Sequence, residues 1–313
     1  MDIAPLLSPL AYPDPLARAP RVGPEDTGHI LPTPPVLQGA VVAAISRDTR
    51  GLTMNDAQRL THFPASPLMS LSWFQHTEAS MIERGDAQQL SSWRPSGADS
   101  TVVISGSQSR PSVCWAHENG RAGMICFTAD IARTLFGIDP AAVHDRFVPA
   151  HEVMGATWSP LLDALVWSPD DAATLAALRD HIAPRWQALH GRSTTAPSLR
   201  QLGRHWVERL AWQAHEWRRT HSPRQVERRV KAFSGRSLRD WQSLVRTEGL
   251  FFAARERYET GQPFDWATLA LDHGFADQSH LVRVTRHIAG FSPGEFAERF
   301  EHDESFWMYR LWI

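Results

Sequence analysis

The pattern of hydrophobic and polar positions divides the chain into a strand-like first half and a helical second half. Between residues 36 and 130, short apolar runs alternate with turns rich in Pro, Gly, Asn and Ser, which is typical of a small sandwich or barrel. Strands are predicted at 36–45, 68–76, 101–105, 112–118 and 121–128. Helical periodicity follows at 131–137 and 170–189, and the second of these helices serves either internal packing or dimerisation.

A turn at Asn119-Gly120 separates two of these strands, and each strand carries one of the chain's two cysteines. Asn-Gly between strand-like runs indicates a two-residue hairpin, and in that register Cys114 and Cys126 point to opposite faces of one sheet. We therefore expect buried, reduced thiols rather than a disulfide. The pair also lacks the CxxC spacing of a zinc site.

A chain of 313 residues is long enough for two ordinary domains, and the predicted fold class is α+β. We expect an irregular segment at 1–35, a β-barrel-like or sandwich-like sensory or dimerisation domain with added helices at 36–190, and a linker of small residues at 191–197. An all-α domain follows at 198–300, with an apolar tail at 301–313. The tail is expected to pack against its own chain, and docking across the domain interface to report on an effector is the alternative.

The helical half contains one unit twice, at an offset of 55 residues. Gly235 and Ser237 of the first copy align with Gly290 and Ser292 of the second. The helices before these glycines also match in layout. We therefore expect two copies of one structural unit.

A polar N-cap, Ser222 in the first unit and Asp277 in the second, opens a helix before each glycine. In the second unit a short apolar helix at 266–271 and a turn at Gly274 precede it, which is the helix-turn-helix layout. Apolar positions at helical spacing face inward and leave the opposite face polar. On the outward faces we expect Arg224, Glu227, Arg228 and Lys231 in the first helix, and Ser279, Val282, Arg283 and Arg286 in the second.

These outward faces have the chemistry of a DNA reader. A planar guanidinium group can bond a guanine edge bidentately or grip phosphate. Two such helices about 34 Å apart would enter successive major grooves, and the segment 237–260 is the predicted rigid connector. Residues 198–300 hold 17 Lys and Arg against 12 Asp and Glu, whereas residues 1–197 hold 14 against 19. A basic half beside an acidic half suits a DNA-contacting module joined to a domain that does not touch DNA.

The runs 274–284 (GFADQSHLVRV) and 290–296 (GFSPGEF) resemble the signature of AraC/XylS-type transcription regulators. The two-unit part covers about 100 of the 313 residues. Residues 106–111 and 127–155 are more weakly similar to the sensory or dimerising β-domains that precede such modules. The resemblance adds Gln225 and Gln278 to the predicted DNA contacts, and His280 beside them completes the set. It implies promoter DNA and RNA polymerase as partners.

Two departures from the family pattern affect the expected packing. His215-Glu216 stands where a Leu-Ala pair usually packs the first helix, and Leu281 and Thr285 stand where aromatic core residues are common. We therefore expect an irregular first unit with weaker or altered base reading.

The predicted function is sequence-specific DNA binding by a transcription regulator, with activation implied by the resemblance. The N-terminal domain is expected to sense a small molecule or to form a homodimer. The candidate effector contacts are Trp73, His76, Trp93, Trp115 and His117, although core packing explains the tryptophans equally well. The alternative function is a DNA-associated protein-interaction factor without effector binding.

Other classes of protein lack support in the sequence. No apolar run approaches the roughly 20 residues of a membrane span. The N-terminus has neither a basic start nor a continuous apolar segment, so we expect a cytoplasmic protein, nucleoid-associated when bound to DNA. His117-Glu118 has no nearby partners for a cupin-type metal site, and no phosphate loop, HExxH or nucleophile elbow is present. We therefore predict no enzymatic activity, catalytic residue, metal or cofactor.

Overall fold

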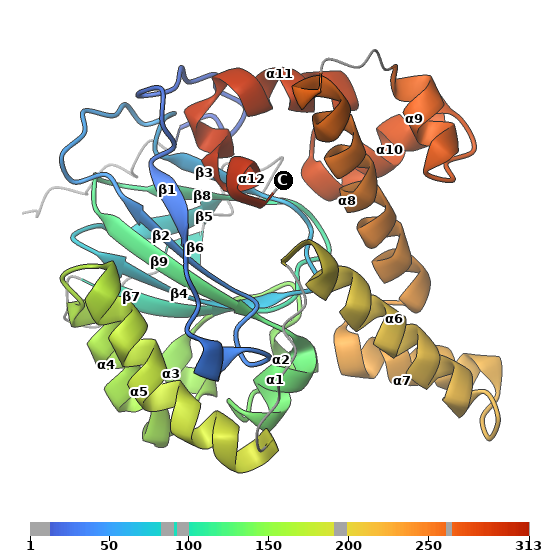
Figure 1. The fold of residues 1–313 in the computed structure, drawn as a ribbon, viewed down its shortest axis with the longest axis horizontal. Helices are drawn as coiled ribbons and strands as arrows, with labels where there is room; N and C mark the ends of the chain where they lie inside the picture. The colour runs from blue at the N-terminus through green and yellow to red at the C-terminus, as the bar shows by residue number, and fades with distance from the viewer. Residues whose placement is uncertain (1–12, 83–90, 93–99, 191–198, 261–264, 313) are drawn as a thin grey trace, which may run out of the picture.

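The computed structural model describes residues 13–82, 91–92, 100–190, 199–260 and 265–312. Its first half contains two antiparallel sheets, one above the other in Figure 1. The larger sheet has the order β1 (Gly28–Leu31), β2 (Ala43–Asp48), β9 (Arg121–Phe127), β4 (Met69–Gln75), β7 (Ser100–Ser105) and β10 (Phe147–Pro149). The smaller sheet has the order β3 (Leu60–Phe63), β8 (Ser112–Ala116), β5 (Ala79–Ile82) and β6 (Ser91–Ser92). The described strands thus form a pair of sheets and not a closed barrel.

Four of the five predicted strands occur with ends shifted by two residues or fewer, as β4, β7, β8 and β9. The predicted strand at 36–45 is largely wrong. A 3-10 turn, η1 (Pro35–Leu37), occupies its start, and β2 begins only at Ala43. Pro34 and Pro35 favour the turn, because proline lacks the N–H group that a sheet ladder requires.

The hairpin predicted at Asn119-Gly120 is also wrong. β8 pairs with β3 and β5, whereas β9 pairs with β2 and β4, so the two flanking strands belong to different sheets. The turn bonds instead to the segment after β2. Gly120 N donates to Thr49 Oγ1 (3.0 Å), and Thr49 N donates to Gly120 O (2.9 Å). The Asn-Gly signal predicts a local turn, but the pairing of the strands depends on segments far away in sequence.

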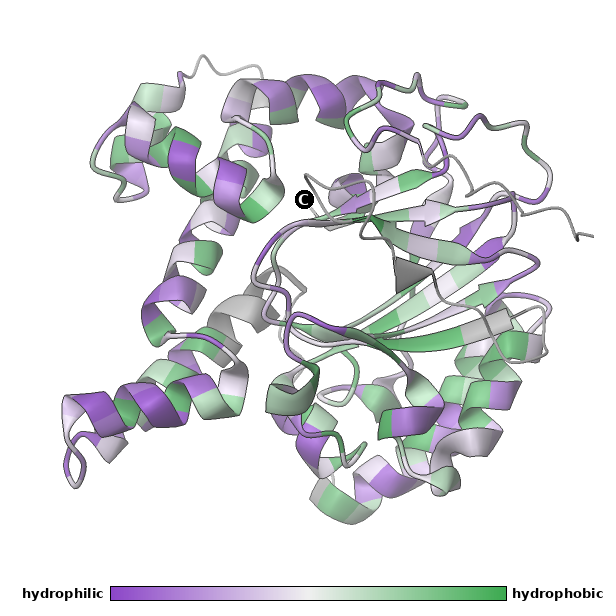
Figure 2. Ribbon diagram, turned by 180° about the vertical axis from the view of Figure 1, so that it is seen from behind, coloured by the Kyte–Doolittle hydropathy of each residue, from purple (hydrophilic) through white to green (hydrophobic). Residues whose placement is uncertain are grey.

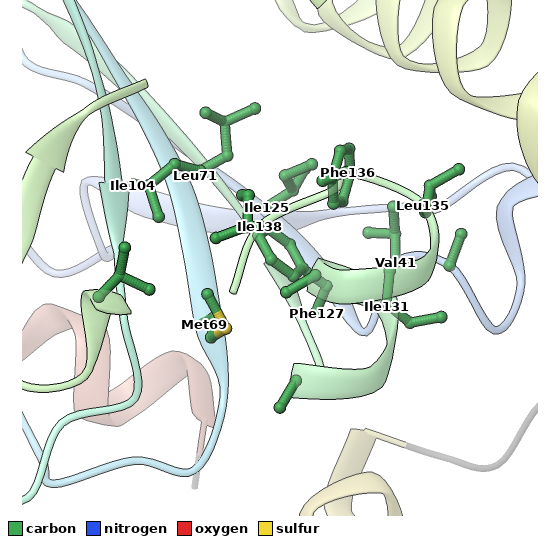
Figure 3. Packing of buried hydrophobic residues seen from close by; sticks show 14 of the residues in the cluster. Val41, Met69, Leu71, Ile104, Ile125, Phe127, Ile131, Leu135, Phe136 and Ile138 are labelled. Atoms are coloured by element: carbon green, nitrogen blue, oxygen red, sulfur yellow. The ribbon is translucent and has the colours of Figure 1, made fainter. Parts of the chain in front are cut away.

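Helices cover the face of the larger sheet that is turned away from the smaller one (Figure 1). They are α1 (Ala129–Thr134), α2 (Pro140–Val143), α3 (Ala150–Val153), α4 (Ser159–Trp167) and α5 (Asp171–His190), with the 3-10 turn η2 (Ala156–Trp158). Figure 3 shows Leu71, Ile104 and Ile125 of the sheet beside Phe136 and Ile138 of the segment after α1. Burial of these side chains provides the main hydrophobic stabilisation of this half.

The described C-terminal region is helical, as predicted. It contains α6 (Leu199–Trp217), α7 (Pro223–Ser234), α8 (Leu238–Glu259), α9 (Trp266–Asp272), α10 (Gln278–Ala289), α11 (Pro293–His302), η3 (Glu304–Phe306) and α12 (Trp307–Trp312). Figure 2 shows hydrophilic and hydrophobic residues alternating along these helices, as expected of elements with one buried face. Val207, Val226 and Trp241 belong to the same hydrophobic cluster as the larger sheet. The predicted domain boundaries therefore stay a prediction, and the predicted linker at 191–197 lies outside the described residues.

The apolar tail packs on the N-terminal sheets, which confirms that it packs against its own chain. Phe306, Trp307, Met308 and Tyr309 are all buried, and α12 lies against β1 and β3. In the described part of the chain, none of the helices combines the length and apolar character needed to span a bilayer.

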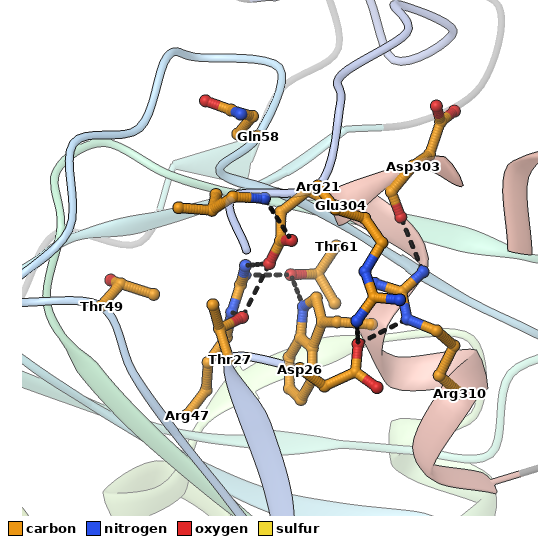
Figure 4. A network of polar contacts seen from close by, with 12 residues as sticks. Arg21, Asp26, Thr27, Arg47, Thr49, Gln58, Thr61, Asp303, Glu304 and Arg310 are labelled. Atoms are coloured by element: carbon orange, nitrogen blue, oxygen red, sulfur yellow. Dashed lines mark hydrogen bonds and ion pairs between the residues drawn. The ribbon is translucent and has the colours of Figure 1, made fainter. Parts of the chain in front are cut away.

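Buried polar contacts hold this tail in place (Figure 4). Arg47 of β2 donates to Glu304 Oε1 (2.9 Å), and Trp307 Nε1 donates to Thr61 Oγ1 (2.9 Å). Burial lowers the pKa of Arg47 to about 10, and Glu304 opposes that shift, so the guanidinium group keeps its charge at neutral pH. Arg310 forms a further ion pair with Asp26. We call the pairs Arg47–Glu304, Thr61–Trp307 and Asp26–Arg310 the clasp.

A methyl group at Gly123 of β9 would lie 2.1 Å from the Trp73 ring, which is fully buried. We expect Gly123→Ala to lower the free energy of unfolding by about 1–3 kcal/mol, because the ring must shift within a packed core. Gly51→Ala is the matched control, since nothing lies within 4 Å of its added methyl group. Denaturant titrations of both variants measure the difference, and equal stabilities would contradict this packing.

Candidate DNA-binding surface and internal cavity

The first helix pair consists of α6 and α7. Ser222 and Gln225 form a reciprocal capping box at the start of α7, and Gly235 ends the helix in a left-handed conformation with φ of +83°. A Cβ atom at Gly235 would also collide with the His144 ring. Val226 and Val230 are buried on the inner face. The cap at Ser222 and the inward positions are therefore as predicted.

The helices of the first unit are regular, contrary to the expectation, whereas its weaker or altered base reading stays a prediction. α6 is continuous over Leu199–Trp217, with Leu210 and Ala214 buried against neighbouring helices. His215 is exposed and Glu216 is half-buried, so this pair need not fill the packing role of a Leu-Ala pair.

The second helix pair, α9 and α10, repeats this layout. Asp277 accepts a hydrogen bond from His280 N (2.6 Å) and caps α10, while Gly290 ends it with φ of +87°. Gly274, with φ of +73°, forms the turn between the helices. Leu281 and Thr285 are fully buried, so these departures from the family pattern still form the inner face.

The 55-residue offset holds at the level of whole elements. Adding 55 to the bounds of α7 (Pro223–Ser234) gives those of α10 (Gln278–Ala289), and the starts of α8 and α11 correspond in the same way. α8 runs between the two pairs as a single helix of 22 residues, which corresponds to about 33 Å at 1.5 Å per residue. The predicted rigid connector is thus present.

The outward faces of α7 and α10 carry the predicted residues. Arg224, Arg228, Arg283 and Arg286 are exposed, and within the described residues none of these four guanidinium groups has a carboxylate partner. Lys231 pairs with Glu227 at 2.9 Å, a contact that raises the pKa of Lys231. The exposed and half-exposed members of the second face are Gln278, Ser279, His280, Val282, Arg283 and Arg286.

The side chains of two predicted contact residues, Gln225 and His280, form hydrogen bonds with the nearby backbone. Gln225 Oε1 accepts from Ser222 N (2.9 Å), so its side chain holds the start of α7. His280 Nδ1 accepts from Ala276 N (3.2 Å) and orders the turn before α10. The arginines are therefore the side chains most available to a ligand. The sequence pattern predicts which residues face outward, but it does not show which outward side chains bond to their own backbone.

A cavity of about 220 Å³ lies between the two sheets. Ser72, Phe74 and Met124 of the larger sheet line one side, and Cys114 and Ala116 of the smaller sheet line the other. Helices α8, α10 and α12 contribute Phe251, Ile288 and Trp307. The cavity thus touches the sheets, the second helix pair and the tail.

The four candidate effector residues that the structure describes do not line this cavity. Trp73 is buried in the core beneath the larger sheet, and Trp115 packs with Leu60 and Ile82 on the outer side of the smaller sheet. His117 lies beside Trp115, and His76 is an exposed turn residue with φ of +59°. The remaining candidate, Trp93, lies outside the described residues. Because side chains alternate along a strand, the lining residues are often their immediate neighbours, such as Ser72 and Cys114.

Both cysteines are free, buried and reduced, as predicted, but their predicted orientation is wrong. They come from different sheets and line the same cavity. Burial raises the pKa of each thiol to about 12, and for Cys114 the charge of Arg47 partly opposes this shift. Among the described residues, no group of three or more His, Cys, Asp or Glu side chains is placed to hold a metal ion.

Comparison with known proteins gives only a distant similarity. No protein-family model and no curated protein matches this chain. Among solved structures, ToxT from Vibrio cholerae is 11% identical with a TM-score of 0.35, over 76% of this chain and 96% of that one. An apo variant of ToxT from strain SCE256 has 11% identity and a TM-score of 0.39, over 77% of this chain and 94% of that one. ToxT bound to (E)-4-(8-methylnaphthalen-1-yl)but-3-enoic acid has 10% identity and a TM-score of 0.35, with 76% and 96% covered. No family membership follows from values this low.

The raised pKa values predict that the thiols of Cys114 and Cys126 react slowly in the folded protein. At pH 8 both thiols remain protonated in the folded protein, whereas unfolded cysteine has a pKa of about 8.5 and is partly thiolate. We expect both cysteines to react with a disulfide reagent at least tenfold more slowly in the native protein than in denaturant, measured by absorbance of the released thiolate. Rapid labelling of either cysteine in the native protein would contradict their burial.

Proposed function

We propose that this protein is a sequence-specific DNA-binding transcription regulator of the AraC/XylS type. The observation that carries the proposal is the equivalence of α7 and α10, each with two exposed arginines on its outward face, at opposite ends of one helix. Packing of these helices does not require positive charge at the outward positions of both copies.

The dimensions of the helical region support two-site reading of DNA. The connector α8 is about 33 Å long by its residue count, and successive major grooves on one face of B-DNA are about 34 Å apart. In the proposed complex α7 and α10 enter neighbouring grooves. Arg228 and Arg283 contact base edges or phosphates, and Ser279 and Val282 meet base edges. The ion pair between Glu227 and Lys231 limits how α7 contacts DNA, because DNA binding must either break this pair or accommodate it.

The N-terminal half is the proposed regulatory part, which responds to a small molecule or forms a homodimer. Its cavity, rather than the set Trp73, His76, Trp93, Trp115 and His117, is the better candidate for an effector site. We further propose that the protein acts in the cytoplasm, associated with the nucleoid when bound to DNA, and activates transcription through RNA polymerase. These roles follow from the family resemblance of the helical region.

Selection from a random duplex library at fixed salt tests the proposal. The wild-type protein should enrich a site with two recognition elements about one helical turn apart. The double variant Arg228→Ala/Arg283→Ala should lose this enrichment, because it removes one arginine from each reader. Arg50→Ala/Arg179→Ala is the control, since it removes the same charge from exposed positions outside the helix pairs.

The outcome separates the two functional alternatives. Equal enrichment by the wild type and by the Arg228/Arg283 variant would reject the assigned readers. Binding that is salt-dependent but without sequence preference would favour the DNA-associated interaction factor instead.

The single substitution Arg283→Ala distinguishes base reading from phosphate contact. We expect a loss of about 1–3 kcal/mol on the selected site and relaxed preference at one base position. Fluorescence anisotropy with a panel of single-base variants of that site measures both effects. The same loss on every duplex would assign Arg283 to phosphate.

A further inference from the structure

The cavity between the sheets has an adaptable, apolar lining. Five of the chain's seven methionines, Met54, Met69, Met81, Met124 and Met308, contribute to it. Methionine has a flexible, polarisable side chain that fits apolar ligands of different shapes. The aromatic residues Phe74, Phe251 and Trp307 add to this surface.

The charged residues that line the cavity are two arginines, each paired with a carboxylate, and one glutamate. Arg47 pairs with Glu304, and Arg59 pairs with Asp56. The Arg47 guanidinium also lies 4.7 Å from the centre of the Trp307 ring. The remaining charged lining residue is the acidic Glu248. Both arginines of the described lining already have a carboxylate partner, so an anionic ligand would lose its hydration without gaining an unpaired cation.

The volume of the cavity limits the size of its ligand. A cavity of about 150 Å³ in an engineered protein holds benzene, and sites for drug-sized molecules usually measure about 300–1,000 Å³. A space of about 220 Å³ falls between these values. It suits a molecule of two or three fused or linked small rings, or a short branched hydrocarbon chain.

The tail residues that line the cavity are next to residues that contact the second helix pair directly. Trp307 and Met308 line the cavity, and the next residue, Tyr309, directs its hydroxyl group to Ala289 O (3.4 Å) at the end of α10. Ile288 of the same turn lines the cavity, and its carbonyl oxygen accepts from Ala65 N (2.8 Å) of the N-terminal half. One segment therefore both lines the cavity and contacts the helix that carries Arg283.

We propose that this cavity binds a compact, uncharged, apolar molecule and that the C-terminal segment 303–312 transmits its presence to α10. The clasp holds Trp307 against Thr61 and close to Gly28, where an added Cβ atom would meet the Trp307 ring at 2.2 Å. A ligand that fills the space beside Trp307 and Met308 stabilises the C-terminal segment. Through Tyr309 and Ile288 it also stabilises the last turn of α10. This regulatory role rests on the proposed DNA-binding function, whereas the ligand site itself does not.

A matched pair of fluorescent dyes tests the class of ligand on the full-length protein. N-phenyl-1-naphthylamine is uncharged, and 8-anilino-1-naphthalenesulfonate has the same ring framework with a sulfonate group. We expect the uncharged dye to bind with at least tenfold lower Kd. Absence of binding by the uncharged dye, or tighter binding of the sulfonate, would overturn the proposal.

Cavity-filling variants locate the bound dye. Ala116→Leu/Ala122→Leu enlarges two lining residues from facing sheets and should raise the Kd of the uncharged dye at least tenfold. Ala172→Leu/Ala297→Leu adds the same atoms at exposed positions and should leave the Kd unchanged. Ser72→Leu fills the cavity from β4 and serves if the double variant fails to fold. Unchanged binding by a folded cavity-filling variant would place the dye elsewhere and overturn the proposal.

Hydrogen–deuterium exchange of the wild type tests the transmission without any DNA. Saturation with the uncharged dye should slow amide exchange at least threefold at 303–312 and at 285–291, around the end of α10. A smaller effect is expected at 223–234, in α7. Protection confined to the sheets would overturn the role of the C-terminal segment. Because neither dye binding nor exchange involves DNA, failure here is distinguishable from failure of the proposed DNA-binding function.

Discussion

The buried pair between Arg47 and Glu304 fixes the C-terminal segment on the N-terminal sheets. It joins β2 to the turn that follows α11, and Glu304 also accepts hydrogen bonds from Thr27 Oγ1 (2.7 Å) and Val22 N (3.2 Å). A carboxylate that is fully buried is tolerable only with such partners. With Glu304 fixed, Trp307 lies between the two sheets, against Gly28 and Arg47 of the larger one and Thr61 of the smaller one, and lines the cavity. The tail is thus part of the N-terminal core as well as the end of the helical region.

The helical region depends on a second constraint, the repeat of one capped unit. Each unit begins a helix with a polar N-cap, buries one apolar face and ends at a left-handed glycine, Gly235 or Gly290. The cap and the glycine fix where each helix starts and stops, so the same positions face outward in both units. α8 then holds the two outward faces at a set separation. The geometry that supports DNA reading therefore arises from short local signals and one long helix.

The sequence predicts features with local causes and misses those that depend on distant partners. The bounds of α7 and α10 follow from capping residues, glycines and the spacing of Val226 or Leu281. The pairing of β8 and β9 could not be predicted, because an Asn-Gly turn does not specify which strands will lie beside it. The cavity was missed for a related reason. Whether Trp73 or its neighbour Ser72 faces a cavity depends on which side of the sheet the helices cover, and that is decided by the packing of α1–α5.

Hydroxyl-radical footprinting of the protein on its selected duplex measures where α7 and α10 lie on DNA. We expect two protected windows on one face of the duplex, centred about 10–10.5 base pairs apart. Arg228→Ala should weaken one window and Arg283→Ala the other. A single window that responds to both substitutions, or protection without this spacing, would contradict the placement of α7 and α10 in successive major grooves.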